Sequence, residues 1–205
     1  LFSMHNRGCA IVFIGFCCDE GVSRNQGRVG AQEAPLALRK ALATLPVHYA
    51  EGLKLMDAGD ICCDNKDMEG AQLVLAEAIA KILAGGGFPL VLGGGHEVTY
   101  GHYLGIRKHV QQETIGVINI DAHLDCRATV AGKGNSGTGF YQIANDCEDG
   151  QADFQYMAIG IQQISNTKAL FDFAATKGVK LIRRTDFCAP NIEQLKAKIT
   201  AFAAT

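Results

Sequence analysis

The chain has 205 residues, of which 48% are hydrophobic and 20% are charged, an ordinary globular composition with enough chain to bury the core of one domain. Its 19 Lys and Arg residues against 21 Asp and Glu leave a formal net charge of −2, so no basic excess attracts nucleic acid or anionic lipid. Apolar runs such as residues 9–18 are too short to cross a membrane, and residues 1–7 lack the features of a signal peptide. We therefore expect a cytoplasmic protein with neither nucleic acid nor membrane as partner.

Eight cysteines are more than average but too few for a disulfide scaffold. Two pairs are adjacent in the sequence, Cys17-Cys18 and Cys62-Cys63. No Cys-x-x-Cys pattern occurs, which leaves no basis for a zinc ribbon or a thioredoxin-like site. Reduced thiols are the simpler interpretation, and a redox role for the two adjacent pairs is the alternative.

In chain order, short apolar runs alternate with helical patterns, which predicts a parallel sheet covered by helices. The predicted strands are residues 9–15, 53–58, 88–92, 114–120, 154–161 and 179–182. Helices are predicted over residues 35–45, where Pro35 suits a first turn, 68–83 and 192–202, with a long polar loop over 19–30. No linker divides the chain, so we predict one α/β domain over residues 1–205.

Two polar clusters follow the third and fourth predicted strands, where ligands of such sheets bind. The first is Asp121-Ala-His123-Leu-Asp125. If this segment is extended, alternate side chains point the same way, so two carboxylates and an imidazole converge as metal ligands. The alternative is a turn in which the aspartates cap a helix and the histidine is merely exposed. The apolar run 116–120 favours a metal site. This run predicts a buried strand, and the charge of Asp121 at its end would be costly to bury without a partner.

The second cluster is Gly93-Gly-Gly-His96-Glu97. A phosphate-binding loop is one interpretation, but the Lys-Ser/Thr pattern of such loops is missing, and a plain strand-to-helix turn is another. Glu97 either orients a ligand or begins the next helix. Beside the first cluster, His96 becomes a candidate fourth ligand. Oxygen and nitrogen donors without a thiolate suit manganese better than structural zinc, and two such ions can share one site.

Both clusters resemble motifs of the ureohydrolases, the family of arginase, agmatinase and formimidoylglutamase. Residues 15–31 with 34–39, then 135–140 and 160–167, are similar to segments of formimidoylglutamases in particular. The resemblance extends from about residue 9 to the end of the chain. It implies the three-layer arginase-like α/β fold, a parallel sheet with helices on both faces.

The same resemblance implies the hydrolysis of N-formimidoyl-L-glutamate to L-glutamate and formamide, a step of histidine breakdown, with two manganese ions per intact subunit. Asp121 would bridge the ions, His96 and Asp125 would bind one of them, and His123 the other. A metal-bridging hydroxide would be the nucleophile.

Four residues lie on loops that the resemblance places near the substrate: Asn25, Arg28, Ser136 and Thr138. Arg28 could bind a carboxylate of the substrate through two hydrogen bonds, or could be an ordinary surface arginine.

The chain also departs from the family pattern. Gly139 stands where the family usually has proline, and Tyr141 where an arginine is expected. The family's third motif, Asp-x-Asp on a later strand, is missing after residue 150. We therefore expect a chain that is incomplete at its C-terminus and inactive by itself. In the family's sheet the missing strands lie between the third and fourth strands, so both of these should have open edges.

Two other functions stay open. The first is another ureohydrolase, acting on agmatine or a guanidino acid. The second is a catalytically inactive fragment that serves as a binding or oligomerisation module. Assembly into a homo-oligomer stays open as well.

Overall fold

The computed structural model describes residues 10–49, 52–187 and 189–204, so Cys9, the predicted start of the first strand, lies outside the described residues. The described chain forms two compact units. The first consists of residues up to 111 together with 129–139, and the second of residues 112–128 together with the chain from 140 onward. None of the described helices is long and apolar enough to cross a membrane. The single domain expected from the sequence stays a prediction.

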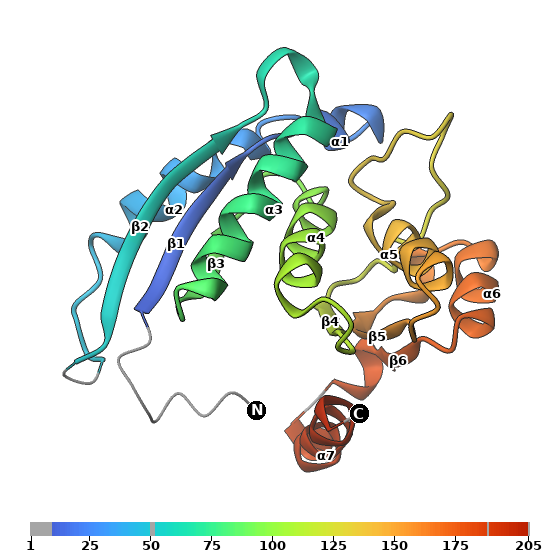
Figure 1. Ribbon diagram of the computed structural model, residues 1–205. Coiled ribbons are helices and arrows are strands. Elements are labelled where there is room, and N and C mark those ends of the chain that lie inside the picture. The colour runs from blue at the N-terminus through green and yellow to red at the C-terminus, as the bar shows by residue number, and fades with distance from the viewer. Residues whose placement is uncertain (1–9, 50–51, 188, 205) are drawn as a thin grey trace. The chain divides into compact units, whose positions relative to one another are not determined.

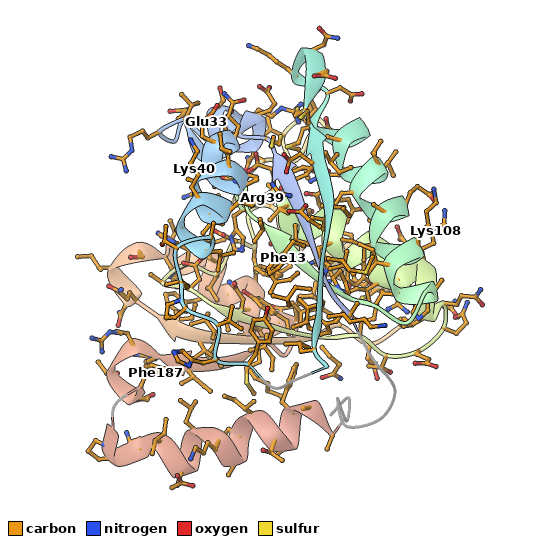
Figure 2. All side chains as sticks on the ribbon, turned by 90° about the vertical axis from the view of Figure 1, so that its left-hand side faces the viewer. Phe13, Glu33, Arg39, Lys40, Lys108 and Phe187 are labelled. Carbon is orange, nitrogen blue, oxygen red and sulfur yellow. The ribbon has the colours of Figure 1, made fainter. Side chains whose placement is uncertain are left out.

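The first unit is built on a parallel three-stranded sheet in the order β2-β1-β3. One helix, α2, lies on one face, and α3 lies on the other with α4 packed against it (Figures 1 and 2). The elements of this unit are β1 (Ala10–Cys17), α1 (Glu20–Arg24), α2 (Ala34–Leu42), β2 (Lys54–Cys62), α3 (Met68–Ala84), β3 (Phe88–Leu92) and α4 (Val98–Val110).

The core of the first unit lies between β1 and α3. Ile14 and Phe16 on β1 are buried against Leu75 and Ile79, which recur one turn apart on α3. The side chain of Asp67 caps the start of α3 by accepting a hydrogen bond from Gly70 N. Helix α3 therefore has both an apolar face for the sheet and a fixed first turn.

A β-bulge changes the register between β1 and β2. Phe13 lies opposite Asp57, but Gly15 lies opposite Asp60, so β2 contains one extra residue. Gly59 has a φ of 79°, a left-handed conformation that glycine adopts without strain. Arg39 reaches from α2 to the bulge (Figure 2) and donates to both oxygens of Asp57, to Asp60 Oδ1 and to the carbonyl of Gly59, at 2.6–3.0 Å.

We expect Arg39→Met to destabilise the first unit, because it removes every side-chain donor from the bulge. The loss should be about 1 kcal/mol at neutral pH, since both aspartates are partly exposed. It should shrink in acid, because the guanidinium holds the pKa of Asp57 below its usual range and protonation of that carboxyl ends the pairing. Urea unfolding at several pH values measures it. Lys40→Met, on the exposed side of α2, is the control, and equal losses for both variants would contradict this role.

The second unit is built on a parallel sheet in the order β4-β5-β6. Met157 and Ile159 on β5 pack against α7 on one face, and Tyr156 stacks on Phe140 of α5 on the other, with ring centres 4.1 Å apart. The elements are β4 (Gly116–Ile120), α5 (Gly139–Asp149), β5 (Gln155–Ile161), α6 (Lys168–Thr176), β6 (Lys180–Arg183) and α7 (Ile192–Ala203). Strand β5 buries both faces, which explains its apolar run, whereas β4 and β6 are largely exposed within the described residues.

The structure confirms the parallel strands and the helices that were predicted, and as expected β3 and β4 are edge strands within the described residues. Four details differ. The predicted loop over residues 19–30 contains the short helix α1. Strand β2 was predicted to end at residue 58 but continues to Cys62, because pairing with β1 resumes after the bulge. Helices α5 and α6 were not predicted, although each buries apolar residues at helical spacing, such as Ile143 and Cys147 in α5 and Leu170 and Ala174 in α6. Helix α2 ends at Leu42, before Leu45.

Candidate metal centre and substrate loops

Asp121 follows directly after β4. Its backbone N–H donates to the carbonyl of Ile159 at 2.9 Å, so β5 still holds the chain at this point. One oxygen of Asp121, Oδ1, then accepts the backbone N–H of His123 at 3.0 Å and lies 3.1 Å from Nδ1 of the same residue. A carboxylate and an imidazole are thus paired at the carboxyl end of β4. The expectation that a buried strand delivers Asp121 is wrong, because β4 lies at the edge of its described sheet with Ile118 and Ile120 exposed.

The expectation of an extended segment over 121–125 is wrong. The chain bends after Ile120, and Asp125 has a φ of 45°, in the left-handed region. A local turn brings Asp121 and His123 together. Their contact does not arise from the alternation of side chains along an extended strand. No helix follows directly, so the aspartates do not cap one.

Asn166 holds this turn from the loop after β5. Its Nδ2 donates to the carbonyls of Ala122 and Gln162, both at 2.8 Å, and its Oδ1 accepts the N–H of Leu124 at 2.9 Å. The Tyr156 hydroxyl donates to the carbonyl of Leu124 at 3.2 Å. Sequence reasoning assigned no role to Asn166, although it lies in the segment 160–167 that carries part of the family resemblance.

The donor chemistry of this turn suits a manganese ion. Asp121 and His123 offer oxygen and nitrogen, and the one nearby thiol does not compete. Cys126 is buried, donates to the carbonyl of Leu124, and has its pKa raised to about 12 by burial, so it stays protonated. The side chains of this turn therefore fit the predicted set of metal ligands, which consists of oxygen and nitrogen donors and includes no thiolate.

His96 lies in the turn between β3 and α4 of the first unit. Gly94 has a φ of 82°, and a Cβ there would lie 2.5 Å from the carbonyl oxygen of Cys18 and closer still to that of Phe16. Gly95 N donates to Cys18 O at 2.8 Å. The glycines therefore let this turn lie against the end of β1, which accounts for them without a bound phosphate.

Glu97, next to His96, is buried with 1% of its surface exposed. Its Oε1 accepts the N–H of Gly21 at 3.0 Å, and its backbone carbonyl accepts a hydrogen bond from Gln72 Nε2 at 2.7 Å. Among the described residues, Oε2 has no hydrogen-bond partner. Burial raises the pKa of this carboxyl. Glu97 both precedes α4 and joins its start to α1 and α3.

We expect Glu97→Gln to stabilise the fold at pH 8 by about 1 kcal/mol, because the amide keeps the bond from Gly21 without a buried charge. The folded-state pKa is raised, so the stability of wild type falls as the pH rises through it, and the two proteins should converge toward pH 4. Urea titrations across this range measure the difference. Glu33→Gln, at an exposed carboxylate, should show no such trend. A wild type more stable than the variant at pH 8 would mean that the charge is compensated.

The structure brings together two of the predicted substrate residues. Asn25 Nδ2 donates to Ser136 Oγ at 3.1 Å, and Ser136 N donates to Gly21 O at 3.1 Å. Thr138 is buried, and its hydroxyl accepts from Asn135 N at 2.8 Å and donates to Asn135 O at 3.0 Å. Arg28 is exposed. Thr138 thus holds the loop together, while Asn25 and Ser136 form one polar pair.

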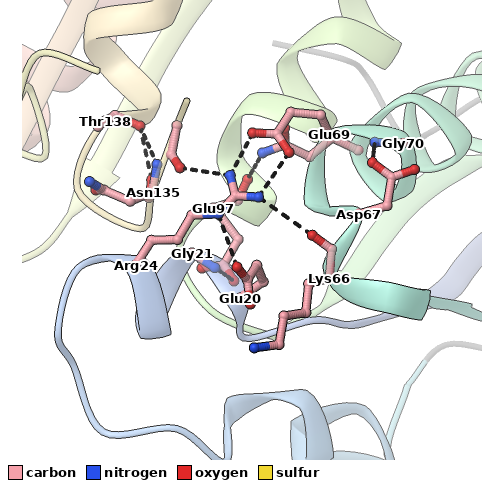
Figure 3. A network of polar contacts seen from close by, with 12 residues as sticks. Glu20, Gly21, Arg24, Lys66, Asp67, Glu69, Gly70, Glu97, Asn135 and Thr138 are labelled. Carbon is pink, nitrogen blue, oxygen red and sulfur yellow. Dashed lines mark hydrogen bonds and ion pairs between the residues drawn. The ribbon is translucent and has the colours of Figure 1, made fainter. Parts of the chain in front are cut away.

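A network around Arg24 fixes the same loop (Figure 3). The guanidinium binds both oxygens of Glu69, at 2.5 and 3.1 Å, and Nε donates to Glu20 at 3.1 Å. It also donates to the carbonyl of Gly134 at 3.1 Å, which joins the loop 129–139 to α1 and α3. The charge of Arg24 lowers the pKa of Glu69. Sequence reasoning missed Arg24, since nothing near it in the sequence shows its partners.

We expect Arg24→Met to loosen the loop 129–139. Losing the bond to Gly134 should speed hydrogen exchange at the Ser136 amide by about tenfold, the equivalent of about 1.4 kcal/mol of local stability. Mass-spectrometric or NMR exchange measures this, with Arg28→Met as the matched control at an exposed arginine. Unchanged exchange in Arg24→Met would show that the loop does not depend on the network.

Comparison with known proteins identifies the family and the fold. The family model described as "Arginase family" matches residues 9–205. The chain belongs to the arginase family. Its arginase-like fold also matches a crystal structure of Trypanosoma cruzi formiminoglutamase with Mn2+2, with a TM-score of 0.78 and 29% identity, over 95% of this chain and 68% of that one.

Several curated relatives in the family are formimidoylglutamases. That of Chromobacterium violaceum is 46% identical over 96% of this chain and 62% of its own length. That of Geobacillus thermodenitrificans is 47% identical over 95% of this chain and 59% of its own length. The chain therefore spans about three fifths of the length of the curated relatives that it matches.

Proposed function

We propose that the protein is a manganese-dependent formimidoylglutamase, which hydrolyses N-formimidoyl-L-glutamate to L-glutamate and formamide. The observation that carries this proposal is the 46% identity to a formimidoylglutamase over nearly the whole chain. The Asp121–His123 pair, placed by β4 and held by Asn166, supplies ligand chemistry that fits it. The cytoplasmic location expected from the sequence stays a prediction.

His96, Asp121, His123 and Asp125 would hold the metal, with Asp121 between two manganese ions and His96 and Asp125 on the same ion. The Mn2+2 in the structure of the T. cruzi relative supports this assignment. When bound, manganese supplies positive charge that acidifies a water molecule and offsets the negative charge that develops on the substrate. The family's further carboxylates, expected on a later strand, would complete the set.

The turn after β4 prepares the ligands before any metal binds. The carboxylate of Asp121 orients His123 through the backbone N–H and the ring, and Asn166 keeps the turn from relaxing. Because these contacts are made in the folded chain, binding an ion needs little reordering of this part of the site. The neighbouring thiol of Cys126 is buried and donates to the carbonyl of Leu124.

Substrate binding is assigned to Asn25, Arg28, Ser136 and Thr138. Asn25 and Ser136 already form one polar pair that can reorient toward a substrate, and Thr138 fixes the loop that carries Ser136. The exposed guanidinium of Arg28 matches a carboxylate of formimidoylglutamate in charge and shape. Tyr141, where the family has arginine, packs against Phe173 with ring centres 5.5 Å apart, so it contributes packing in place of charge.

The test uses the protein expressed at the full length of its reading frame, metal-free and then supplied with manganese. N-formimidoyl-L-glutamate, agmatine and a guanidino acid are offered in parallel, and glutamate, urea and formamide are measured. We expect manganese-dependent release of glutamate and formamide. Hydrolysis of agmatine or of the guanidino acid instead would assign another ureohydrolase activity. No turnover of any of them would leave a non-catalytic binding role.

Asp121→Asn tests the metal assignment. We expect activity to fall by more than about 100-fold, because residues that only support a ligand already cost about 10- to 100-fold when changed. Manganese binding, followed by calorimetry, should weaken in parallel. Asp153→Asn, at an exposed aspartate before β5, is the control. Wild-type activity in Asp121→Asn would disprove the bridging role.

A further inference from the structure

The four adjacent cysteines come together at the carboxyl ends of β1 and β2, and the proposed hydrolase uses none of them. Cys17 lies directly opposite Cys62 in the parallel register, and Cys63 N donates to Cys17 O at 3.1 Å. All four side chains are thiols.

Cysteines that are adjacent in the sequence have their nearest thiol on the other strand segment: Cys17 lies opposite Cys62. Cys17 and Cys62 are the last residues of β1 and β2, and Cys18 and Cys63 follow directly after them. Burial differs within each sequence pair, since Cys18 is buried while Cys17 is half-buried, and Cys63 is half-buried while Cys62 is exposed. The thiol of Cys17 lies close enough to that of Cys62 for each to influence the other, as does the thiol of Cys18 to that of Cys63. The result is a cross-strand pair, Cys17 and Cys62, followed by a second pair just beyond the strand ends.

The bulge in β2 creates this pairing. Before it, β1 residues lie opposite residues 44 positions later, as Phe13 does with Asp57. After it the offset is 45, as between Cys17 and Cys62. Without the extra residue, Cys17 would lie opposite Ile61. The contact of Arg39 with the bulge therefore maintains the register that joins the thiols.

The two pairs differ in access. Cys18 is 1% exposed and belongs to the apolar cluster around Ile14 and Phe16, with Cys63 packed against it. Cys62 is exposed and Cys17 half-buried. A small reagent in solution can therefore reach the Cys17–Cys62 pair but not Cys18.

We propose that Cys17 and Cys62 are a modification site, a dithiol that a small disulfide such as oxidised glutathione converts to a cross-strand disulfide, while Cys18 and Cys63 stay reduced. Neighbouring strands lie about 4.8 Å apart, within the span of about 4.4–6.8 Å between the Cα atoms of disulfide-bonded cysteines. This proposal does not depend on the hydrolase activity.

The reaction is a thiol–disulfide exchange in two steps. The exposed Cys62, as thiolate, attacks one sulfur of the small disulfide; its S–S bond breaks and one thiolate leaves. Cys17 then gives its proton to solvent and attacks the sulfur of Cys62, and the second thiolate leaves. Two electrons pass from the cysteines to the small disulfide, which becomes two thiols.

The order of attack follows from the surroundings. Burial, and then the charge of Asp60, raise the pKa of Cys17 to about 11, so this thiol stays protonated in neutral solution. Cys17 is therefore the resolving thiol, which acts once Cys62 is held beside it in a mixed disulfide.

The experiment incubates the folded protein with oxidised glutathione, blocks remaining thiols with N-ethylmaleimide in denaturant, and maps the peptides by mass spectrometry. We expect one internal disulfide, between the peptides that hold Cys17 and Cys62, with the loss of two hydrogens and reversal by dithiothreitol. Cys18 and Cys63 should carry the blocking reagent.

Two matched variants assign the bond. Cys62→Ser, at an exposed position, should abolish it, and Cys63→Ser, one residue away, should leave it in place. A disulfide that survives in Cys62→Ser, or is lost in Cys63→Ser, would overturn the proposal. So would a folded protein that retains glutathione on Cys62 without closing the bond, or that forms the bond only when unfolded.

Discussion

The backbone where β1 passes into α1 is the constraint on which the first unit depends. The carbonyls of Phe16 and Cys18 stand so close to the β3–α4 turn that only glycine fits at position 94. Three residues further along the chain from Cys18, in α1, Gly21 donates to Glu97 and accepts from Ser136. One short stretch of main chain thereby positions the turn that bears His96 and the loop that bears a predicted substrate residue. Because these contacts are made by the backbone, side chains elsewhere can vary without disturbing them, but a change in the course of the main chain would break them.

In the second unit, the side-chain amide of a single residue, Asn166, holds the backbone of the turn after β4. Asn166 satisfies one N–H and two carbonyls of backbone that has left the sheet, and such groups are costly when they are buried without a partner. The tyrosine beneath, stacked on Phe140, supplies another hydrogen bond. The carboxylate of Asp121 and the imidazole of His123 thus lie in a turn that hydrogen bonds from Asn166 and Tyr156 hold in place. Because these contacts orient both side chains, the turn is compatible with the predicted binding of a metal ion.

The sequence was sufficient for the parts of the structure that follow from local rules. Apolar runs such as 88–92 predicted strands, and the clusters at Asp121 and His96 stood out because polar residues directly follow such runs. It was insufficient wherever partners are distant in the chain. Arg24 meets Glu69 after 45 residues and Gly134 after 110, and no pattern near Arg24 reveals either. The left-handed conformation of Asp125 likewise has no signature that separates it from an extended residue. The assignment of the site residues to metal and substrate stays a prediction.

The extra residue in β2 also determines which face of the sheet each later side chain of this strand occupies. Side chains of a strand alternate between faces, so the bulge inverts which face each later residue occupies relative to an uninterrupted strand. Deleting one residue near Gly59 would therefore do more than shorten a turn: Ile61, packed against the core, and the polar or thiol side chains beside it would exchange places. A single-codon deletion there would therefore remove Ile61 from its contact with the core and also move every later residue of the strand to the other face. Among relatives of this chain, length should accordingly vary in the loops on either side of β2 before it varies within the strand.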